Sequence, residues 1–162
     1  MITCIVAMDE QGNIGMDGHM PWHISEELYL FQQLTRHHTL LMGRKTWESI
    51  GHPLTERKLL IASKTKQIYP YEQVYPAGDV LSLLQYYQNH KEVLMVCGGE
   101  MIYELALPYT TCLYISKIKG IYPSDTSFPS FDITDFKCMD QIDYASFTWY
   151  YYKRKKDVAC DL

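Results

Sequence analysis

Residues 93–107, VLMVCGGEMIYELAL, contain a strand pattern, a pair of glycines and a helix pattern in direct succession. The apolar run VLMVC is short and continuous, which is typical of a strand buried on both faces. After Gly98 and Gly99, apolar residues recur at helical spacing until Pro108. Glycine allows a tight turn and a close approach of a ligand to the backbone. This order indicates one unit of an α/β protein with a parallel sheet.

The same order recurs on the N-terminal side of this stretch. TLLMG (39–43) predicts a strand that ends on a glycine, and RKTWESI (44–50) predicts a short helix directly after it. KLLIAS (58–63) is another strand candidate, and ITCIVAM (2–8) predicts a buried strand at the start of the chain. The repetition favours several adjacent units of one sheet.

The remaining patterns complete the predicted fold. Helical spacing covers 24–37 and 80–90, and two longer strand candidates, 112–120 and 146–155, close the chain. Because no helix pattern separates the last two strands, we expect the final one to run antiparallel. The prediction is a single α/β domain over 1–162, with a mostly parallel central sheet, an antiparallel C-terminal strand and helices on both faces. Ligands of such sheets bind at the carboxyl ends of the strands.

Composition and charge exclude several classes of function. Hydrophobic residues make up 47% of the chain and charged residues 21%, and the net charge of −4 argues against nucleic acid as the main partner. The five cysteines are scattered without a CxxC pair, so neither a disulfide framework nor a metal site is expected. No apolar stretch approaches transmembrane length, and the N-terminus lacks the basic region of a signal peptide. We therefore expect a cytoplasmic protein with no membrane partner.

Three junctions after predicted strands carry groups that suit phosphates. At Gly43 and at Gly98–Gly99 a helix pattern begins directly after glycine, so unpaired backbone N–H groups are offered to an anion. Ser63 and Lys64 add a hydroxyl and a cation at the same edge of the sheet. Lys64 and Arg44 together can hold a further phosphate, such as the 2′-phosphate of NADP. Neither a GxGxxG nor a GxxxxGK motif is present, so the prediction depends on the three junctions together.

A long loop separates the first predicted strand from the first predicted helix. Residues 9–22, DEQGNIGMDGHMPW, are glycine-rich and mostly polar, and they exceed the few residues that such a connection usually takes. Long ordered loops at this edge of a sheet often act as lids. Met20, Pro21 and Trp22 return apolar bulk just before the helix, which suits the exclusion of water from a flat ring. The stretch SDTSFP (124–129) predicts a turn or a brace for this lid.

The helix predicted after the loop carries an acid on its apolar stripe. Ser25 is the expected N-cap. The stripe consists of Ile24, Leu28, Phe31 and Leu34. Glu27 falls on the same stripe, while Glu26 points away from it. Acidic residues in the first turn of a helix are also stabilised by its dipole, so a surface role and a buried functional role for Glu27 both remain open at this point.

In this order and spacing, several stretches resemble the dihydrofolate reductase family nearly from end to end. They are IVAMDEQGNIG, MPWHISEELYLF, LLMGRKTWESIGHPLTERK, VCGGEMIYE, SDTSFP and the closing aromatic strand. The family reduces 7,8-dihydrofolate to tetrahydrofolate, with a hydride from NADPH added at pterin C6 and a proton at N5. The resemblance implies NADPH as cofactor, no metal, and dihydrofolate and antifolates as the ligands. A monomer is expected.

The resemblance also implies roles for individual residues. Glu27 matches the active-site acid, Ser116 its hydrogen-bond partner, and Trp22 either a core aromatic residue or the holder of a water near Glu27. The positions matching the substrate site are Ile5, Met20, Leu28, Phe31, Ile50 and Leu54, with Arg57 for the glutamate α-carboxylate. The positions matching the cofactor site are Ala7, Ile14, Gly43, Arg44, Lys45, Thr46, Ser63, Lys64, Cys97, Gly98, Gly99, Glu100, Met101, Ile102 and Tyr103. A cis peptide between Gly98 and Gly99 is implied as well.

The chain departs from the family's pattern at some of these positions. Glu27 stands where bacterial members often carry Asp, and Ser116 stands where Thr is usual. Met101 occupies a position that is Arg in some members, so the grip on the 2′-phosphate depends on the other basic residues. Gln32 and His52 replace cations found in some relatives near the substrate tail. These two replacements bear on affinity for the tail and not on the reaction.

A carboxylate on an apolar face suits the pterin ring. The ring is flat and apolar on its faces, and its edge carries an amidine-like pair of donors that a carboxylate accepts together. Burial should raise the pKa of Glu27. Its predicted role is to orient the pterin and to favour protonation at N5, with a water near Met20 delivering the proton.

Two other functions remain alternatives to dihydrofolate reduction. A related pyrimidine reductase of flavin synthesis would share the fold, but it would need neither Glu27 nor Arg57 for a glutamate tail. A nucleotide-binding module without catalysis would keep the glycine turns, but it would have no use for a buried acid beside a lid.

Overall fold

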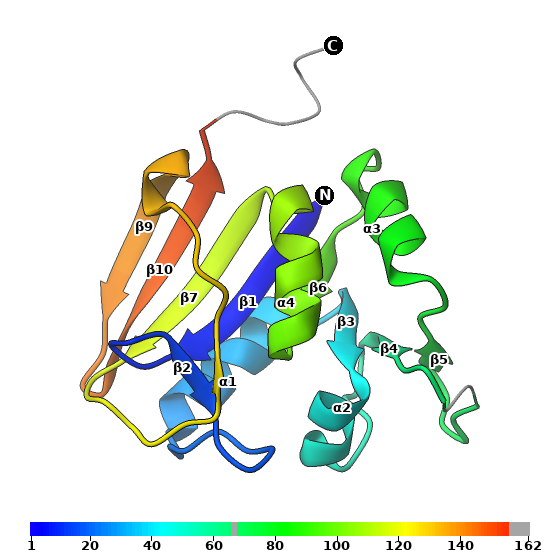
Figure 1. Ribbon diagram of the computed structural model, residues 1–162, viewed down its shortest axis with the longest axis horizontal. Coiled ribbons are helices and arrows are strands. Elements are labelled where there is room, and N and C mark those ends of the chain that lie inside the picture. The colour runs from blue at the N-terminus through cyan, green and yellow to red at the C-terminus, as the bar shows by residue number, and fades with distance from the viewer. Residues whose placement is uncertain (66–67, 156–162) are drawn as a thin grey trace.

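Ten strands are present in the computed structural model, which describes residues 1–65 and 68–155 (Figure 1). They are β1 (Ile2–Met8), β2 (Asn13–Gly15), β3 (Thr39–Gly43), β4 (Lys58–Ala62), β5 (Val74–Pro76), β6 (Leu94–Val96), β7 (Cys112–Ile118), β8 (Thr126–Ser127), β9 (Phe136–Asp143) and β10 (Phe147–Arg154). Eight of them form the central sheet in the order β5-β4-β3-β6-β1-β7-β10-β9, and β2 pairs with β8 alone. Neighbours from β5 to β7 run parallel, whereas β10 and β9 are antiparallel, which confirms the predicted class of sheet.

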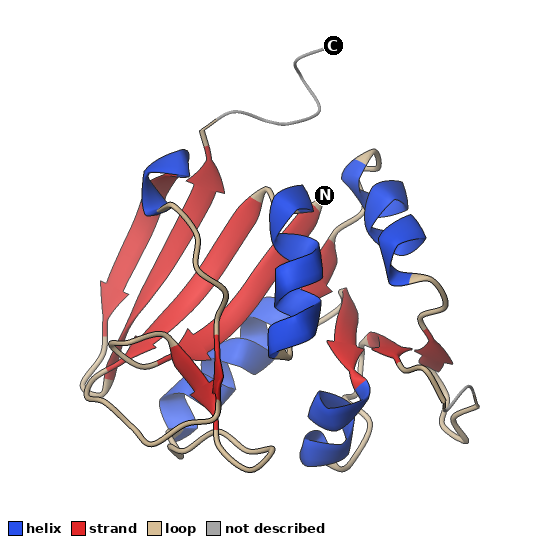
Figure 2. Ribbon diagram, in the orientation of Figure 1, coloured by secondary structure: helices blue, strands red, loops and turns tan. Residues whose placement is uncertain are grey.

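Helices cover both faces of the sheet, as predicted (Figure 2). They are α1 (Ser25–Thr35), α2 (Arg44–Ile50), α3 (Val80–Gln88) and α4 (Glu100–Ala106), with 3-10 turns at Leu107–Tyr109 and Ile133–Asp135. Leu40 and Met42 of β3 belong to a buried cluster with residues of α1 and α2, while Leu41 between them belongs to a cluster with residues of α3 and α4. The strands are continuous apolar runs because each face meets a helix layer.

The start of α1 differs from the prediction. Ile24 is the N-cap, no side-chain hydrogen bond caps the helix, and Ser25 is its first residue. The helix also ends earlier than the apolar pattern predicts, because the chain turns away at His37, which has a φ of 65°. The other predicted elements agree with the observed bounds to within two or three residues, the usual uncertainty at element ends.

Strand β9 is absent from the prediction. It lies at the edge of the sheet, and every residue in it except Phe136 is exposed. An exposed edge strand is built from charged and polar residues and shows no apolar period. Cys160 lies outside the described residues. No helix in the described part of the chain is long and apolar enough to cross a membrane.

Candidate active site

The carboxyl ends of the parallel strands bring the predicted site residues to one edge of the sheet. At the lower edge in Figure 1, β1 leads into the long loop 9–24, β3 leads into α2, and the start of α4 lies nearby. Three segments that are distant in the sequence therefore meet at this edge, as expected for a parallel sheet.

The two predicted glycine turns contact each other. The N–H of Gly43 donates to the carbonyl of Gly98 at 2.9 Å, and the Gly98–Gly99 peptide is cis, as the family resemblance implies. A Cβ on Gly43 would lie 3.4 Å from the Ile102 side chain. Gly98 has a φ of 116°, and a Cβ there would meet the Tyr103 ring at 3.4 Å. The structure thus requires glycine at Gly98, and it leaves bare backbone at the edge where a ligand approaches.

The starts of α2 and α4 lie side by side, without side-chain caps. Gly43 and Gly99 are the N-caps, and neither helix receives a side-chain hydrogen bond at its start. A Cβ on Gly99 would lie 3.5 Å from Thr46 Oγ1, so the two helix starts are adjacent. Backbone N–H groups at two neighbouring helix starts, together with a threonine hydroxyl, are donors that suit the linked phosphates of a dinucleotide. This donor set fits NADPH.

Arg44, one of the two basic residues predicted for the 2′-phosphate, contacts the turn that carries the other. Arg44 donates from its guanidinium to Thr65 Oγ1 at 3.2 Å, and its Nε lies 3.7 Å from Glu48. Thr65 belongs to the turn after β4, in which Lys64 is exposed. Arg44 is therefore directed at the turn that carries Lys64. The side chain of Met101 is exposed at this edge and contributes no charge.

Glu27 is buried, which decides between the two roles that the helix pattern left open. It is 6% exposed, whereas Glu26 is exposed. Burial raises the pKa of Glu27 to about 7, against a smaller lowering by the hydrogen bond that the Ser116 hydroxyl donates. A first-turn acid that served only the helix dipole would stay in solvent, so the surface role is wrong. The carboxyl instead titrates near neutral pH.

The sheet beneath α1 presents the partner of this acid. Ala7, Ser116 and Trp149 lie opposite one another on β1, β7 and β10, so their side chains share a face of the sheet. Ser116 is buried on that face, under the N-terminal half of α1. The antiparallel addition of β10 therefore completes the floor of the site next to β7.

Most of the predicted apolar wall is assembled on the same side of the sheet. Four of the six predicted residues belong to one cluster with Trp47: they are Ile5, Phe31, Ile50 and Leu54. Cys97, predicted for the cofactor, packs against this cluster too. Leu28 is half-buried, and Met20 is 45% exposed on the loop. Ile14 instead packs against the cluster on the other face.

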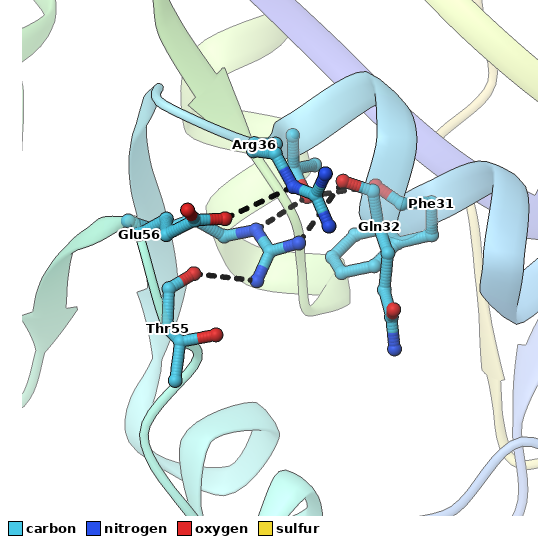
Figure 3. Close-up of polar contacts among 7 residues, drawn as sticks. Phe31, Gln32, Arg36, Thr55 and Glu56 are labelled. Carbon is cyan, nitrogen blue, oxygen red and sulfur yellow. Dashed lines mark hydrogen bonds and ion pairs between the residues drawn. The ribbon is translucent and has the colours of Figure 1, made fainter.

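Arg57 is held in place by three hydrogen bonds (Figure 3). Its Nε donates to Thr35 Oγ1 at 2.9 Å, and its terminal nitrogens donate to the carbonyls of Thr55 at 2.9 Å and Gln32 at 3.0 Å. The side chain is buried, and the Thr35 hydroxyl donates in turn to the Phe31 carbonyl at 2.7 Å. The sequence analysis missed Thr35. The signal was its spacing, because Thr35 falls four residues after Phe31 on the stripe of Glu27.

The guanidinium of Arg57 retains binding capacity. Within the described residues, one N–H on each terminal nitrogen has no hydrogen-bond partner, and such a fork matches a carboxylate. Figure 3 shows Arg36 and Glu56 beside it, paired at 3.1 Å. Burial and the charge of Arg36 lower the pKa of Arg57, and the carboxylate of Glu56 opposes them. An incoming anion would therefore compensate a buried positive charge.

Trp22 is both a core residue and the carrier of an unsatisfied donor. It is buried, and its ring packs edge-to-face on Tyr122 with the centroids 5.4 Å apart. Among residues 1–65 and 68–155, its buried indole N–H has no hydrogen-bond partner. A buried donor in this state usually marks the place of a bound water or ligand group. The core role of Trp22 is thus confirmed, and its role as the holder of a water stays a prediction.

The SDTSFP stretch braces the loop. The N–H of Asp125 donates to the Gly15 carbonyl at 2.9 Å, and its carboxylate accepts the N–H of Asp17 at 3.1 Å. Strands β2 and β8 pair at the same place. Of the two roles predicted for this stretch, turn and brace, the structure thus includes the brace.

Comparisons with known proteins agree with this arrangement. The family model described as dihydrofolate reductase matches residues 1–154. The dihydrofolate reductase of Bacillus subtilis is 36% identical over 139 residues, which cover 85% of this chain and 80% of that protein. The enzyme of Mycoplasma genitalium is 34% identical over 161 residues, which cover 96% and 99%. A solved structure of dihydrofolate reductase from Enterococcus faecalis, complexed with NADP(H) and RAB-propyl, has a TM-score of 0.86 at 29% identity and covers 96% of this chain and 97% of that one. The chain belongs to the dihydrofolate reductase family.

Proposed function

We propose that Glu27 is the group that binds and orients the pterin in the family's reaction, the NADPH-dependent reduction of 7,8-dihydrofolate to tetrahydrofolate. The observation that carries this assignment is a buried carboxyl on the apolar side of α1, with a pKa of about 7. A carboxylate in such a pocket accepts both donors on the pterin edge at once. A group that titrates near neutral pH can also hold a proton at working pH and release it.

Ser116 and Trp22 act on either side of this acid. The Ser116 hydroxyl donates to the Glu27 carboxyl and fixes its orientation. The unsatisfied indole N–H of Trp22 holds a water near Glu27. A water near Met20 delivers the proton to N5 of the pterin. NADPH, when bound, supplies the hydride that reduces C6. The apolar wall of Ile5, Phe31, Ile50 and Leu54 excludes bulk water from the ring.

The cofactor and the substrate tail have separate supports. The contacting glycine turns and the adjacent helix starts hold the linked phosphates, and Arg44 with Lys64 holds the 2′-phosphate. The backbone of Ala7 and Ile14 holds the nicotinamide carboxamide. The open fork of Arg57 receives the α-carboxylate of the glutamate tail. Because every proposed group comes from one chain, we propose a monomer. Antifolates with the same amidine-like edge would occupy the pterin site. We also propose a cytoplasmic location.

The test is an assay of the purified protein with dihydrofolate and NADPH, following the loss of the reduced-nicotinamide absorbance. Glu27→Gln keeps the size of the side chain and removes its charge, so kcat at neutral pH should fall about 10²–10⁴-fold, the usual worth of acid–base assistance. Glu26→Gln is the matched control, because Glu26 is the exposed neighbour in the same helical turn. Wild-type rates in Glu27→Gln would contradict the assignment.

A further inference from the structure

Asp9 is a buried carboxylate at the end of β1 that the proposed reaction does not use. It has 0% exposure. One oxygen accepts the backbone N–H groups of Gln11 at 2.8 Å and Asn13 at 3.0 Å. The other accepts the side-chain amide of Asn13 and the backbone N–H of Tyr122, both at 2.9 Å. Asp9 therefore joins the start of the long loop to the segment that follows β7, 113 residues away.

The four donors keep Asp9 charged and leave it no capacity for a ligand. Burial disfavours the charged form, but the hydrogen bonds from Tyr122, Asn13 and Gln11 outweigh this effect and hold the pKa of Asp9 below its ordinary value. Each oxygen already accepts two donors. A satisfied, buried carboxylate of this kind orders the segments that it joins rather than reacting with substrate.

Tyr122 links this carboxylate to Trp22. The Tyr122 ring packs edge-to-face on the Trp22 indole, at an interplanar angle of 66°. The two rings also border a cavity of about 520 Å³, lined on its other sides by His23, Ile24 and Lys119 among others. Trp22 is packed on its other sides in a buried cluster with Ile118, Phe147 and Trp149, and the Tyr122 ring packs against it beside the cavity. We therefore expect the position of the Trp22 N–H to depend in part on where the backbone of Tyr122 is held.

We propose that Asp9 is a positioning residue for the protonation of the pterin: by fixing the backbone of Tyr122 it helps to fix the indole of Trp22, without touching substrate or cofactor. The proposal rests on the proposed function, in which Trp22 holds a water beside Glu27, the acid that favours protonation at N5. It adds a residue that acts from outside the site.

Asp9→Asn is a selective test of the link to Tyr122. The asparagine keeps one carbonyl oxygen for the N–H groups of Gln11 and Asn13, so the turn that leads to Ile14 is retained. Its new NH₂ group faces two donors. The side chain of Asn13 can turn its own amide oxygen toward that group, but the backbone N–H of Tyr122 has no such alternative. The substitution therefore releases Tyr122 while preserving the loop.

The readouts are the single-turnover rate of hydride transfer, the Kd for NADPH and a thermal melt. Asp9→Asn should slow the turnover about 10-fold or more, since a small misplacement of a positioned group has effects of this size, and should leave NADPH affinity within about 3-fold. Asp132→Asn is the matched control, because Asp132 also accepts an N–H and a hydroxyl, both from Thr134, in a distant 3-10 turn. A lower Tm with an unchanged rate would overturn the proposal.

A double-mutant cycle with Trp22→Phe identifies the route. Trp22→Phe keeps an aromatic ring and loses the N–H. If Asp9 acts through the indole, adding Asp9→Asn to Trp22→Phe should slow the turnover by less than about 2-fold more. If the double variant is slowed by the product of the two single-variant factors, the residues act independently and the proposal is overturned. Trp22→Phe alone tests the proposed function, because wild-type rates there would refute the role of the indole and, with it, this inference.

If Asp9→Asn does not fold, Tyr122→Ala should slow turnover and Tyr122→Phe should not; a wild-type rate in Tyr122→Ala would overturn the proposal.

Discussion

Glu27 is an acid in an environment that favours its neutral form. Its neighbours on the helix stripe are apolar, and the hydrogen bond from Ser116 only partly offsets the loss of solvation. A surface position would have left the carboxyl ionised at neutral pH. The burial that costs stability is therefore the same feature that brings the carboxyl to a working pKa near 7.

The stability of the protein should depend on pH because of the raised pKa of Glu27. The pKa of Glu27 is about 7 in the folded protein, against an ordinary value of 4.5, so the folded state binds more protons between these values. Stability should thus fall as pH rises from 4.5 to 7 and level off above 7. The loss should be at most about 3.5 kcal/mol, at roughly 1.4 kcal/mol per pH unit.

Urea unfolding across this range checks the sign. Glutamine does not titrate. The free energy of unfolding of Glu27→Gln, relative to that of the wild type, should therefore increase as pH rises. Glu26→Gln should run parallel to the wild type. A difference between Glu27→Gln and wild type that stays constant with pH would contradict the shifted pKa.

Arg57 combines a structural and a binding role. Replacing it with leucine removes three hydrogen bonds to the protein and should lower the free energy of unfolding, at roughly 1–3 kcal/mol per charge-assisted hydrogen bond. It should also raise the KM for dihydrofolate, because the fork for the tail carboxylate is lost. A truncated pterin substrate without the glutamate tail is the internal control, and its KM should change little. An equal rise for both substrates would mean that the role of Arg57 is structural.

At the scale of elements, the turn after β4 and the start of α2 form one unit through the contact between Arg44 and Thr65. Arg44 at the start of α2 and Lys64 in the turn after β4 come from different elements. The parallel pairing of β3 with β4 brings the two junctions to the same edge, in register from Thr39 with Lys58 to Gly43 with Ala62. We therefore expect cofactor choice to depend on two neighbouring strands.

The choice between NADPH and NADH should depend on this unit. Arg44→Ala combined with Lys64→Ala should weaken NADPH binding by about 2–6 kcal/mol, at roughly 1–3 kcal/mol per charge-assisted hydrogen bond. NADH, which lacks the 2′-phosphate, should bind with nearly unchanged affinity. Titration of both cofactors by quenching of tryptophan fluorescence measures the two losses. Equal losses would show that these residues do not recognise the 2′-phosphate.

At the scale of the whole molecule, the two faces of the sheet have different tasks. The face under α1 and α2 carries the proposed pterin site, with Glu27, Ser116 and the apolar wall. The face under α3 and α4 carries a larger buried cluster. Tyr103 of α4 connects the layers, because its hydroxyl donates to the carbonyl of Ile5 in β1 at 2.7 Å. The glycine turn before α4 is thereby tied to the central strand.

Local periodicity in the sequence determined most of the elements and placed Glu27 on the apolar stripe of its helix. Continuous apolar runs predicted the parallel strands, and the helix stripe predicted the position of the acid, because both patterns depend on residues a few positions apart. The glycine junctions were likewise visible as short motifs. Strand β9 was not, since an exposed edge strand has no apolar period.

Only the tertiary structure decided which distant groups meet. The partners of Arg57 come from α1 and from the loop before β4, the partner of Glu27 comes from β7, and Tyr122 meets Asp9 across most of the chain. These contacts depend on the order and register of the strands, which bring together residues that no local pattern relates. The sequence therefore determined which groups carry the chemistry, and strand pairing decided which groups hold them in place.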